Sequence, residues 1–326
     1  MDPTPYSILF VTSSSRSGST LLDILLGSLD GYFSTGEIRH IWYRGLLEDW
    51  PCGCGEPFSK CEFWPEVIRS AFGSLTRKDA ERIVELQKQE ERTHRLVFSS
   101  LRPERPLSPQ SLEYQQRLLA LYDATRKISG CRNIVDSSKL GSHGYVVSRM
   151  ANDSGRVDFR SVHLIRDSRA VAYSWYKILK SRGGEPPSGS NLFRSVAFSR
   201  GWIGSNLTSH ILARRVEGQT VMFYEDLARR PTEVLSRFLS EIGLVEAGSI
   251  VKAEAKPTSH HTVSGNQMRM SDKPLEIRPD MAWKKSLPRT LCWGVTLLTS
   301  PFLYRYGYLG GVSSDRSWAG SRSGVG

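Results

Sequence analysis

The sequence predicts an α/β protein with a parallel sheet covered by helices on both faces. Short apolar, β-branched runs alternate with helical segments along the 326 residues, which is the order typical of parallel sheets. Hydrophobic residues make up 39% of the chain, enough for one large core. We expect a single domain over residues 1–311, followed by a disordered tail of Gly- and Ser-rich composition over residues 312–326.

Four segments have the composition of buried strands. They are Tyr6–Thr12, Arg132–Ser138, Arg160–Asp167 and Thr220–Leu227. Helical spacing follows each segment, so we expect a sheet of about four or five strands. The residues between the first two units have helical patterns, which predicts a helical insertion at about residues 66–130 above the sheet edge. Ser181–Ser190 has the composition of a flexible loop.

Charge and hydropathy narrow the functional classes. Lysine plus arginine (44) exceed aspartate plus glutamate (33) by 11, which favours an anionic ligand such as a nucleotide, a nucleic acid or a membrane surface. The basic residues are scattered along the chain, which disfavours nucleic acid as the ligand.

The N-terminus lacks the regions of a signal peptide, so we expect a cytoplasmic protein. Leu291–Tyr304 is shorter than about 18 residues and contains Pro301, which predicts a packed helix and no transmembrane segment.

A loop of small residues, SSSRSGSTLL over Ser13–Leu22, follows the first predicted strand. A strand that opens through such a loop into a helix directs backbone N–H groups at one point, which suits a phosphate or sulfate. Against the nucleotide-triphosphatase loop G-x-x-x-x-G-K-[ST], Gly18 and Thr20 match, but Ser19 stands where the lysine should be. The cation is instead Arg16, from where it reaches the bound group at the start of the loop.

This loop resembles the K/R-S-G-[ST]-[ST] motif of sulfotransferases that use 3′-phosphoadenosine 5′-phosphosulfate (PAPS). The chain is similar to the bacterial type, with motifs like those of the carbohydrate and tyrosylprotein sulfotransferases. The resemblance implies the topology of P-loop nucleotide kinases, and transfer of a sulfuryl group from PAPS to an acceptor hydroxyl without a metal. It implies that the 5′-phosphosulfate is bound by Arg16, Ser17, Gly18, Ser19 and Thr20.

Further segments extend the resemblance. HLIRDSRAVAYSW supplies Arg166 at a strand end and Ser174 eight positions later, where the family binds the 3′-phosphate. The segment YEDL supplies Tyr224, for which the resemblance implies a place near the adenine. HTVSGNQMRM resembles a late loop that folds over the nucleotide in many bacterial members. The positions placed in that loop are Gly265, Asn266 and Arg269.

Two kinds of residue are candidates for the base that activates the acceptor. The tyrosylprotein members imply that Glu37, in STGEIRHIW, is the base and that Lys139, in VDSSK, stabilises the transition state. Members that act on small phenols and steroids use a histidine instead. The available histidines are His40, His143 and His163, the last of which is expected in the core because it lies inside a predicted strand. The choice between Glu37 and a histidine stays open.

Two features favour other interpretations. An apolar strand ending at Asp136 also resembles the magnesium-binding strand of nucleotide triphosphatases, so a magnesium-dependent kinase or triphosphatase is the first alternative. A non-enzymatic nucleic-acid-binding protein is a weaker alternative.

Cys52, Cys54 and Cys61 are soft ligands close in sequence, but no fourth ligand stands at a standard spacing, so we expect thiols or one disulfide and no metal. The oligomeric state and the acceptor, whether a small molecule, a glycan or a peptide, are not predicted.

Overall fold

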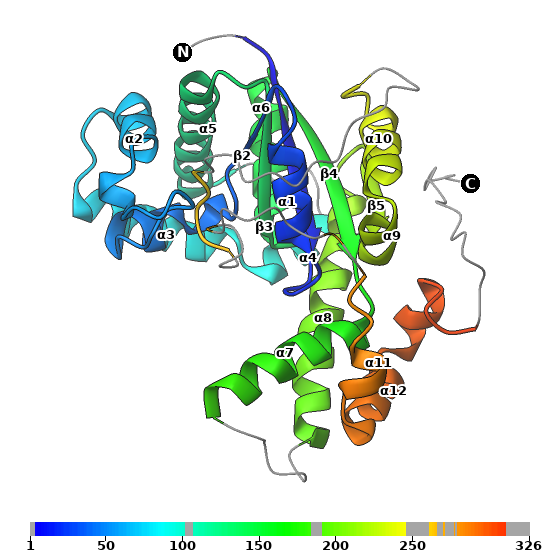
Figure 1. The fold of residues 1–326 in the computed structure, drawn as a ribbon. Helices are drawn as coiled ribbons and strands as arrows, with labels where there is room; N and C mark the ends of the chain where they lie inside the picture. Colours follow the sequence, from blue (N-terminus) through cyan, green and yellow to red (C-terminus); the bar gives the residue numbers. More distant parts are fainter. Residues whose placement is uncertain are drawn as a thin grey trace.

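The structure is a computed structural model that describes residues 4–101, 107–183, 191–245, 261–265, 270, 277 and 279–310. Its centre is one five-stranded sheet in the order β2-β3-β1-β4-β5 (Figure 1). The strands are β1 (Tyr6–Ser13), β2 (Tyr32–Ser34), β3 (Asn133–Lys139), β4 (Val157–Ile165) and β5 (Gln219–Phe223). All neighbouring pairs are parallel, which confirms the predicted α/β class.

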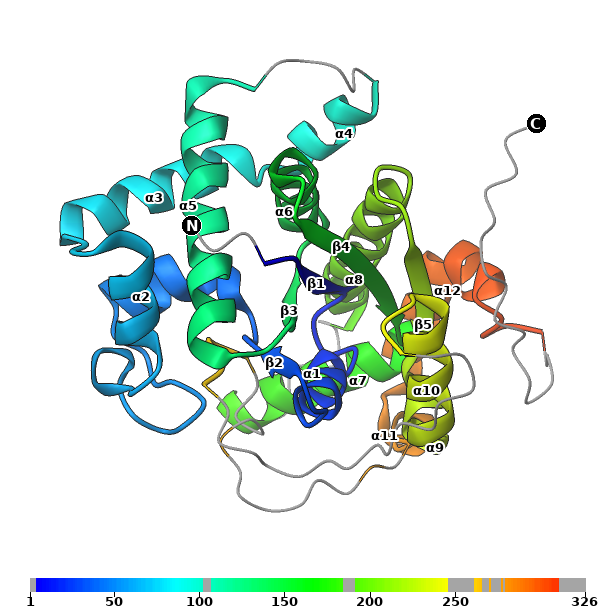
Figure 2. The ribbon, with the colours of Figure 1, turned by 90° about the horizontal axis from the view of Figure 1, so that it is seen from above.

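Helices surround the sheet. Those before β3 are α1 (Ser19–Gly27), η1 (Ile38–His40), η2 (Ile41–Leu47), η3 (Phe58–Lys60), α2 (Trp64–Phe72), α3 (Arg77–Glu90), α4 (Thr93–Leu101) and α5 (Pro109–Ser129). Those after it are α6 (Gly141–Ser154), α7 (Ser168–Gly183), α8 (Asn191–Ala213), α9 (Tyr224–Arg229), α10 (Pro231–Glu241), α11 (Trp283–Ser286) and α12 (Arg289–Arg305). The predicted helical insertion corresponds to α2 to α5, of which α2, α3 and α5 gather on the β2 side (Figures 1 and 2).

Two strands differ from the prediction. The segment predicted as a strand over Thr220–Leu227 is strand only as far as Phe223, because Tyr224 begins α9. Two carboxylates in the first turn of α9 favour a helix start there. The edge strand β2 was not predicted, since a run of three residues is too short to show an alternating pattern.

Both faces of the sheet are apolar and covered. In β1, Ile8 and Phe10 belong to the core cluster that includes residues of α5 and α6. Leu9 and Val11 point the other way, into the cluster with residues of α1 and α10. Figure 2 shows α6 and α8 on one side of the sheet and α1 and α10 on the other. The sheet is therefore the middle of three layers, the arrangement expected for parallel strands.

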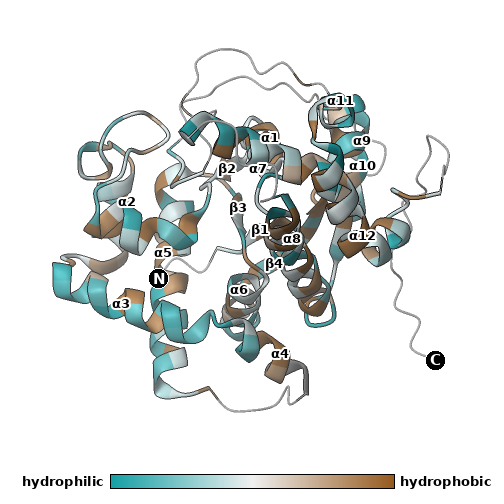
Figure 3. Cartoon of the chain, turned by 90° about the horizontal axis from the view of Figure 1, so that it is seen from below, coloured by the Kyte–Doolittle hydropathy of each residue, from teal (hydrophilic) through white to brown (hydrophobic). Residues whose placement is uncertain are grey.

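A group formed by α7, α11 and α12 lies beyond the carboxyl ends of the strands (Figure 1). The predicted packed helix near the C-terminus is α12, whose Leu291 and Val295 are buried against Trp283 of α11 and Ala172 of α7. No helix among the described residues is long and apolar enough to cross a membrane. Helix α3 is hydrophilic along much of its length (Figure 3), which is typical of a helix that buries only one side.

The tail predicted over residues 312–326 lies outside the described residues, as does most of the loop predicted over Ser181–Ser190.

Candidate functional site

A cavity of about 370 Å³ lies where the carboxyl ends of all five strands meet. Ligands of parallel α/β sheets bind at this edge, because the loops that follow neighbouring strands converge there. Ten residues singled out in the sequence line the cavity: Arg16, Gly18, Ser19, Thr20, Glu37, Lys139, Arg166, Ser174, Tyr224 and Gly265. The structure thus brings together residues from six segments. Asn266 and Arg269 lie outside the described residues.

The loop after β1 leads into α1 at the cavity wall. Gly18 stands immediately before the helix with φ of 90°, and no side chain of the described residues caps the first turn. The first N–H groups of α1 therefore remain available to an anion at the helix end. Ser17 does not line the cavity; its side chain is buried, and its Oγ lies 2.6 Å from Oγ of Ser14, which closes the loop.

Gly18 also makes room for Tyr224. A Cβ atom on Gly18 would lie 2.2 Å from Cδ2 of the Tyr224 ring, so no larger residue fits there without displacing the tyrosine. On Tyr224 lies the guanidinium of Arg166, with its Cζ 4.3 Å from the ring centroid. The cation–π contact fixes the direction of a side chain that is otherwise long and mobile. Three predicted residues from three segments thus form one stack.

Two guanidinium groups meet at the cavity. Nε of Arg16 donates a hydrogen bond of 2.9 Å to Oγ of Ser174, and NH1 of Arg166 donates one of 2.9 Å to the carbonyl oxygen of Arg16. Burial, together with the positive charge of Arg166, lowers the pKa of Arg16. The buried Nε of Arg166 has no acceptor among the described residues. Two like charges and a buried donor without an acceptor are the features of a site that binds an anion.

Sequence reasoning missed two charged residues of this wall. NH2 of Arg166 donates a hydrogen bond of 3.3 Å to Oδ2 of Asp280, and Nζ of Lys177 lies 3.6 Å from the same oxygen. The carboxylate of Asp280 thus contacts Arg166 and Lys177, the two cations that an anion bound at this wall would contact. Lys177 could have been found from its helical spacing, because a residue three positions after Ser174 lies on the same face of α7. Asp280 has no such signal.

Glu37 and Lys139 form an ion pair on the opposite wall, with Nζ of Lys139 2.5 Å from Oε1 of Glu37. Nε2 of His40 lies 3.4 Å from Oε2 of the same carboxylate. Burial raises the pKa of Glu37, but the hydrogen bond of His40 and the hydrogen bond and charge of Lys139 outweigh burial and lower that pKa to about 2. Burial lowers the pKa of His40, although the hydrogen bond to Glu37 acts in the opposite direction. The carboxylate carries its negative charge, neutralised by the ammonium.

Arg16 and Lys139 share an unusual backbone conformation. Their φ angles are 70° and 68°, in the left-handed region that residues with a side chain rarely adopt. Arg16 lies in the loop between β1 and α1, and Lys139 is the last residue of β3. The left-handed turn places both residues on the lining of the cavity.

Of the three candidate histidines, His40 alone reaches a cavity found among the described residues. His163 is fully buried, and Oδ1 of Asn206 lies 3.0 Å from its Nε2, so it is the core histidine expected from the sequence. His143 is also fully buried, with its Nδ1 2.6 Å from Oε1 of Glu91. Burial lowers the pKa of His143, but Glu91 and Asp136 outweigh burial and raise it to about 9.

Asp136 belongs to the same buried network. Its Oδ2 accepts a hydrogen bond of 2.7 Å from the hydroxyl of Tyr122, and its Oδ1 accepts one of 2.9 Å from the backbone N–H of Ser138. The carboxylate is fully buried and lines neither described cavity. A magnesium ion at the nucleotide would need a carboxylate that faces it, and Asp136 does not.

A second cavity of about 630 Å³ adjoins the first and shares Ser15, Glu37 and Lys139 with it. Its other wall is formed by Arg200 of α8 and by a strip of small or short polar residues at helical spacing on the same helix. They are Ala197, Gly201, Gly204, Ser205 and Thr208. Sequence reasoning did not find this wall, because the strip becomes a cavity lining only once α8 is placed beside the end of β3.

The three cysteines lie apart from both cavities, and all three are free thiols. The expectation of no metal depended on the lack of a fourth ligand, but the structure supplies one. His261, about 200 positions away in sequence, stands beside them. No standard motif spacing joins His261 to the cysteines, so the sequence alone could not show this cluster.

No family model and no curated protein matches the chain. Among solved structures, the chain is similar to the sulfotransferase domain of an olefin synthase from Synechococcus PCC 7002, with 21% identity, a TM-score of 0.46, and 92% of this chain and 96% of that one covered. It is also similar to the sulfotransferase domain from the curacin biosynthetic pathway, with 19% identity, a TM-score of 0.48, and coverage of 92% and 98%. Both are sulfotransferase domains.

Proposed function

We propose that this chain transfers a sulfuryl group from PAPS to an acceptor hydroxyl. One observation carries the proposal: Arg16 and Arg166, 150 positions apart in sequence, line one cavity together with six other residues that the sequence resemblance assigns to the donor, namely Gly18, Ser19, Thr20, Ser174, Tyr224 and Gly265. The cavity volume of about 370 Å³ falls within the range of roughly 300–1,000 Å³ for small-ligand sites.

The donor has a place for each of its two anionic groups. The 5′-phosphosulfate lies at the start of α1, within reach of Arg16, Ser19 and Thr20, where the helix end favours negative charge. The 3′-phosphate lies between Arg166 and Ser174, with Lys177 beside it, and displaces Asp280 from these cations. Tyr224 then stands between the two groups, next to Gly18, close to where the adenosine has to pass.

The transfer step makes one bond and breaks one. The acceptor oxygen attacks the sulfur, the bond from sulfur to the phosphate oxygen breaks, and 3′-phosphoadenosine 5′-phosphate (PAP) leaves with the bonding electrons. Arg16 and Lys139 stabilise the negative charge that develops on the departing oxygen. Glu37 takes the proton of the acceptor hydroxyl, with His40 in contact with the same carboxylate.

Lys139 couples donor binding to the activation of Glu37. A carboxylate with a pKa of about 2 is a weak base, and its ion pair with Lys139 keeps it so. The incoming phosphosulfate attracts the ammonium of Lys139 away from Glu37. Without the charge and hydrogen bond of Lys139, burial is opposed only by His40 among these influences, and the pKa of Glu37 rises. The base thus becomes competent only when the donor is in place.

The second cavity is the acceptor site, because it meets the donor cavity at Glu37 and Lys139. A substitution on its α8 wall tests this. Gly204 has open space where a Cβ would stand, so a side chain can be added at this point of the cavity lining, and leucine also improves the helix propensity. We expect Gly204→Leu to raise the KM for the acceptor, Gly204→Ala to raise it less, and both to leave PAP binding unchanged. An unchanged acceptor KM would place the acceptor elsewhere.

Thermal unfolding with PAP and with magnesium-ATP tests the donor assignment. A ligand at about 100 times its Kd adds about 2.7 kcal/mol to stability, so PAP should raise Tm by several degrees. Stabilisation by magnesium-ATP alone would support the kinase or triphosphatase alternative. The nucleic-acid-binding alternative predicts no response to PAP and an affinity for nucleic acid that falls steeply with salt. That result would exclude a sulfotransferase.

Labelled PAPS offered with carbohydrate, lipid, phenol and tyrosine-peptide acceptors would then identify the acceptor.

A further inference from the structure

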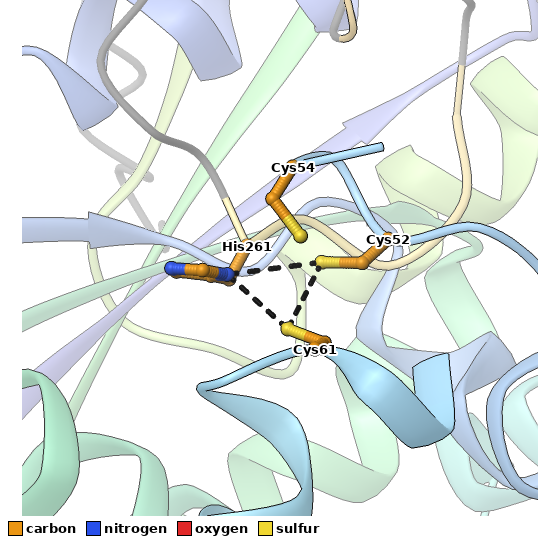
Figure 4. Close-up of side chains that lie close together, drawn as sticks. All are labelled: Cys52, Cys54, Cys61 and His261. Atoms are coloured by element: carbon orange, nitrogen blue, oxygen red, sulfur yellow. Dashed lines mark hydrogen bonds between the residues drawn. The ribbon is translucent and has the colours of Figure 1, made fainter. Parts of the chain in front are cut away.

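Cys52, Cys54, Cys61 and His261 form a cluster outside the donor and acceptor cavities (Figure 4). Their potential ligand atoms, three Sγ and one imidazole nitrogen, all lie within 4.8 Å of one another. Figure 4 shows the four side chains pointing at a common centre from two stretches of chain. Three of the four residues are buried, whereas Cys54 is exposed at the edge of the cluster.

The distances match the edges of a tetrahedron around zinc. With bonds of about 2.3 Å to sulfur and 2.0–2.1 Å to nitrogen, tetrahedral zinc separates two sulfurs by about 3.8 Å and a sulfur from a nitrogen by about 3.6 Å. Sγ of Cys61 lies 3.6 Å from Sγ of Cys52, and Nδ1 of His261 lies 3.2 Å from Cys61 and 3.9 Å from Cys52. A sulfur separation of 3.6 Å also excludes a disulfide bond between Cys52 and Cys61.

The ring of His261 is held in a ligand orientation. It stacks on Phe63, with ring centroids 5.2 Å apart and an interplanar angle of 12°. Its Nδ1 faces the sulfurs, while its Nε2 lies 3.5 Å from Oε1 of Glu62. Histidines that bind zinc characteristically give their second nitrogen to a carboxylate or carbonyl, which fixes the tautomer. The cluster therefore has this outer contact as well as four inner ligands.

We propose that Cys52, Cys54, Cys61 and His261 bind one zinc ion. Three thiolates and one imidazole in tetrahedral arrangement are a preferred zinc ligand set, and four protein ligands leave no open position, as in structural sites. Binding releases the thiol protons to solvent and involves no change of oxidation state. The ion is structural and takes no part in transfer.

The zinc ion joins two segments that shape the donor cavity. The backbone N–H of Gly53 donates to the carbonyl oxygen of Thr262 at 3.0 Å, and the N–H of Val263 donates to that of Thr35 at 2.8 Å. The N–H of Glu37 donates in return to the carbonyl oxygen of Val263 at 2.8 Å. Gly265, two residues further, lines the donor cavity. Removal of the ion should therefore weaken PAP binding, an effect that rests on the proposed function.

Metal analysis of the purified full chain tests the site independently of any activity. We expect one zinc per chain, and X-ray absorption of the zinc-bound protein should give three sulfur ligands and one nitrogen ligand. Cobalt(II) added to the metal-free, reduced protein should give the visible bands of a tetrahedral ion and a near-ultraviolet thiolate charge-transfer band. Less than stoichiometric zinc together with no cobalt bands would overturn the proposal.

Variants assign the metal to this cluster. Cys61→Ser and His261→Gln should each lose the bound zinc or bind it at least tenfold more weakly. The matched control is the double variant Cys131→Ser and Cys292→Ser, which removes the two free thiols outside the cluster and should keep one zinc per chain. Zinc retained unchanged by Cys61→Ser and His261→Gln would place the metal elsewhere. A protein that binds zinc in this way but shows no response to PAP would keep the metal site and overturn the proposed function alone.

Discussion

Replacing Arg16 with alanine should lower sulfuryl transfer by about 10²- to 10³-fold, the effect typical of removing one donor to a developing oxyanion. The loss should appear mainly in kcat, because the charge on the departing phosphate oxygen exists fully only as the bond to sulfur breaks. Arg16→Lys should recover part of the activity, since it keeps the charge but loses the hydrogen bond of Nε to Ser174. Steady-state rates with saturating PAPS measure both variants.

The matched control is Arg77→Ala, which removes an exposed arginine on α3 that lines neither the donor nor the acceptor cavity. It should leave kcat unchanged. Thermal unfolding should show the Arg16→Ala variant folded, because its side chain belongs to no core cluster. Full activity in folded Arg16→Ala would refute the proposed mechanism even if the protein transfers sulfate.

Glu37→Gln should reduce kcat by roughly 10²- to 10⁴-fold, the contribution of a single general base. The pH dependence separates this role from a merely structural one. Activity that depends on an ionised Glu37 falls as pH drops through the pKa of that carboxyl, which gives the profile an acid limb. Lys139→Met removes a charge that lowers the pKa of Glu37 in the free enzyme, so the acid limb of its residual kcat/KM for PAPS, which reports the free enzyme, should lie at higher pH.

Glu85→Gln, an exposed carboxylate on α3, is the control and should keep the rate and pH profile of the native chain. If Glu37→Gln retained its acid limb, the base would be another group, and His40 would be the first to test, because it contacts the same carboxylate. An acid limb that stays in place in Lys139→Met would contradict the coupling between Lys139 and Glu37.

The local patterns of the sequence predict the parts of the fold that are local. The apolar, β-branched run of β1 and the helical spacing after it identify the strand, loop and helix that hold Arg16 and Gly18. The eight-residue interval between Arg166 and Ser174 predicts that both face one site, because a strand end and the second turn of the next helix are fixed relative to each other. The cavity in the structure contains both pairs.

Contacts between distant segments could not be predicted in this way. Asp280 meets Arg166 across 114 positions, and His261 meets Cys61 across 200 positions. Neither residue belongs to a periodic pattern that would place it beside its partner. The sequence pattern does not identify the acceptor wall on α8 either, because small residues at helical spacing also occur where two helices pack closely.

The backbone of Arg16 and Lys139 has a consequence for how this protein balances stability against activity. The left-handed conformation costs about 1–2 kcal/mol for a residue with a side chain, whereas glycine adopts it freely. A chain optimised for stability alone would therefore have glycine at both positions. Glycine at either one should make the fold more tolerant of heat and the enzyme poorer. Part of the folding free energy is thus given up to hold two positive charges beside one cavity.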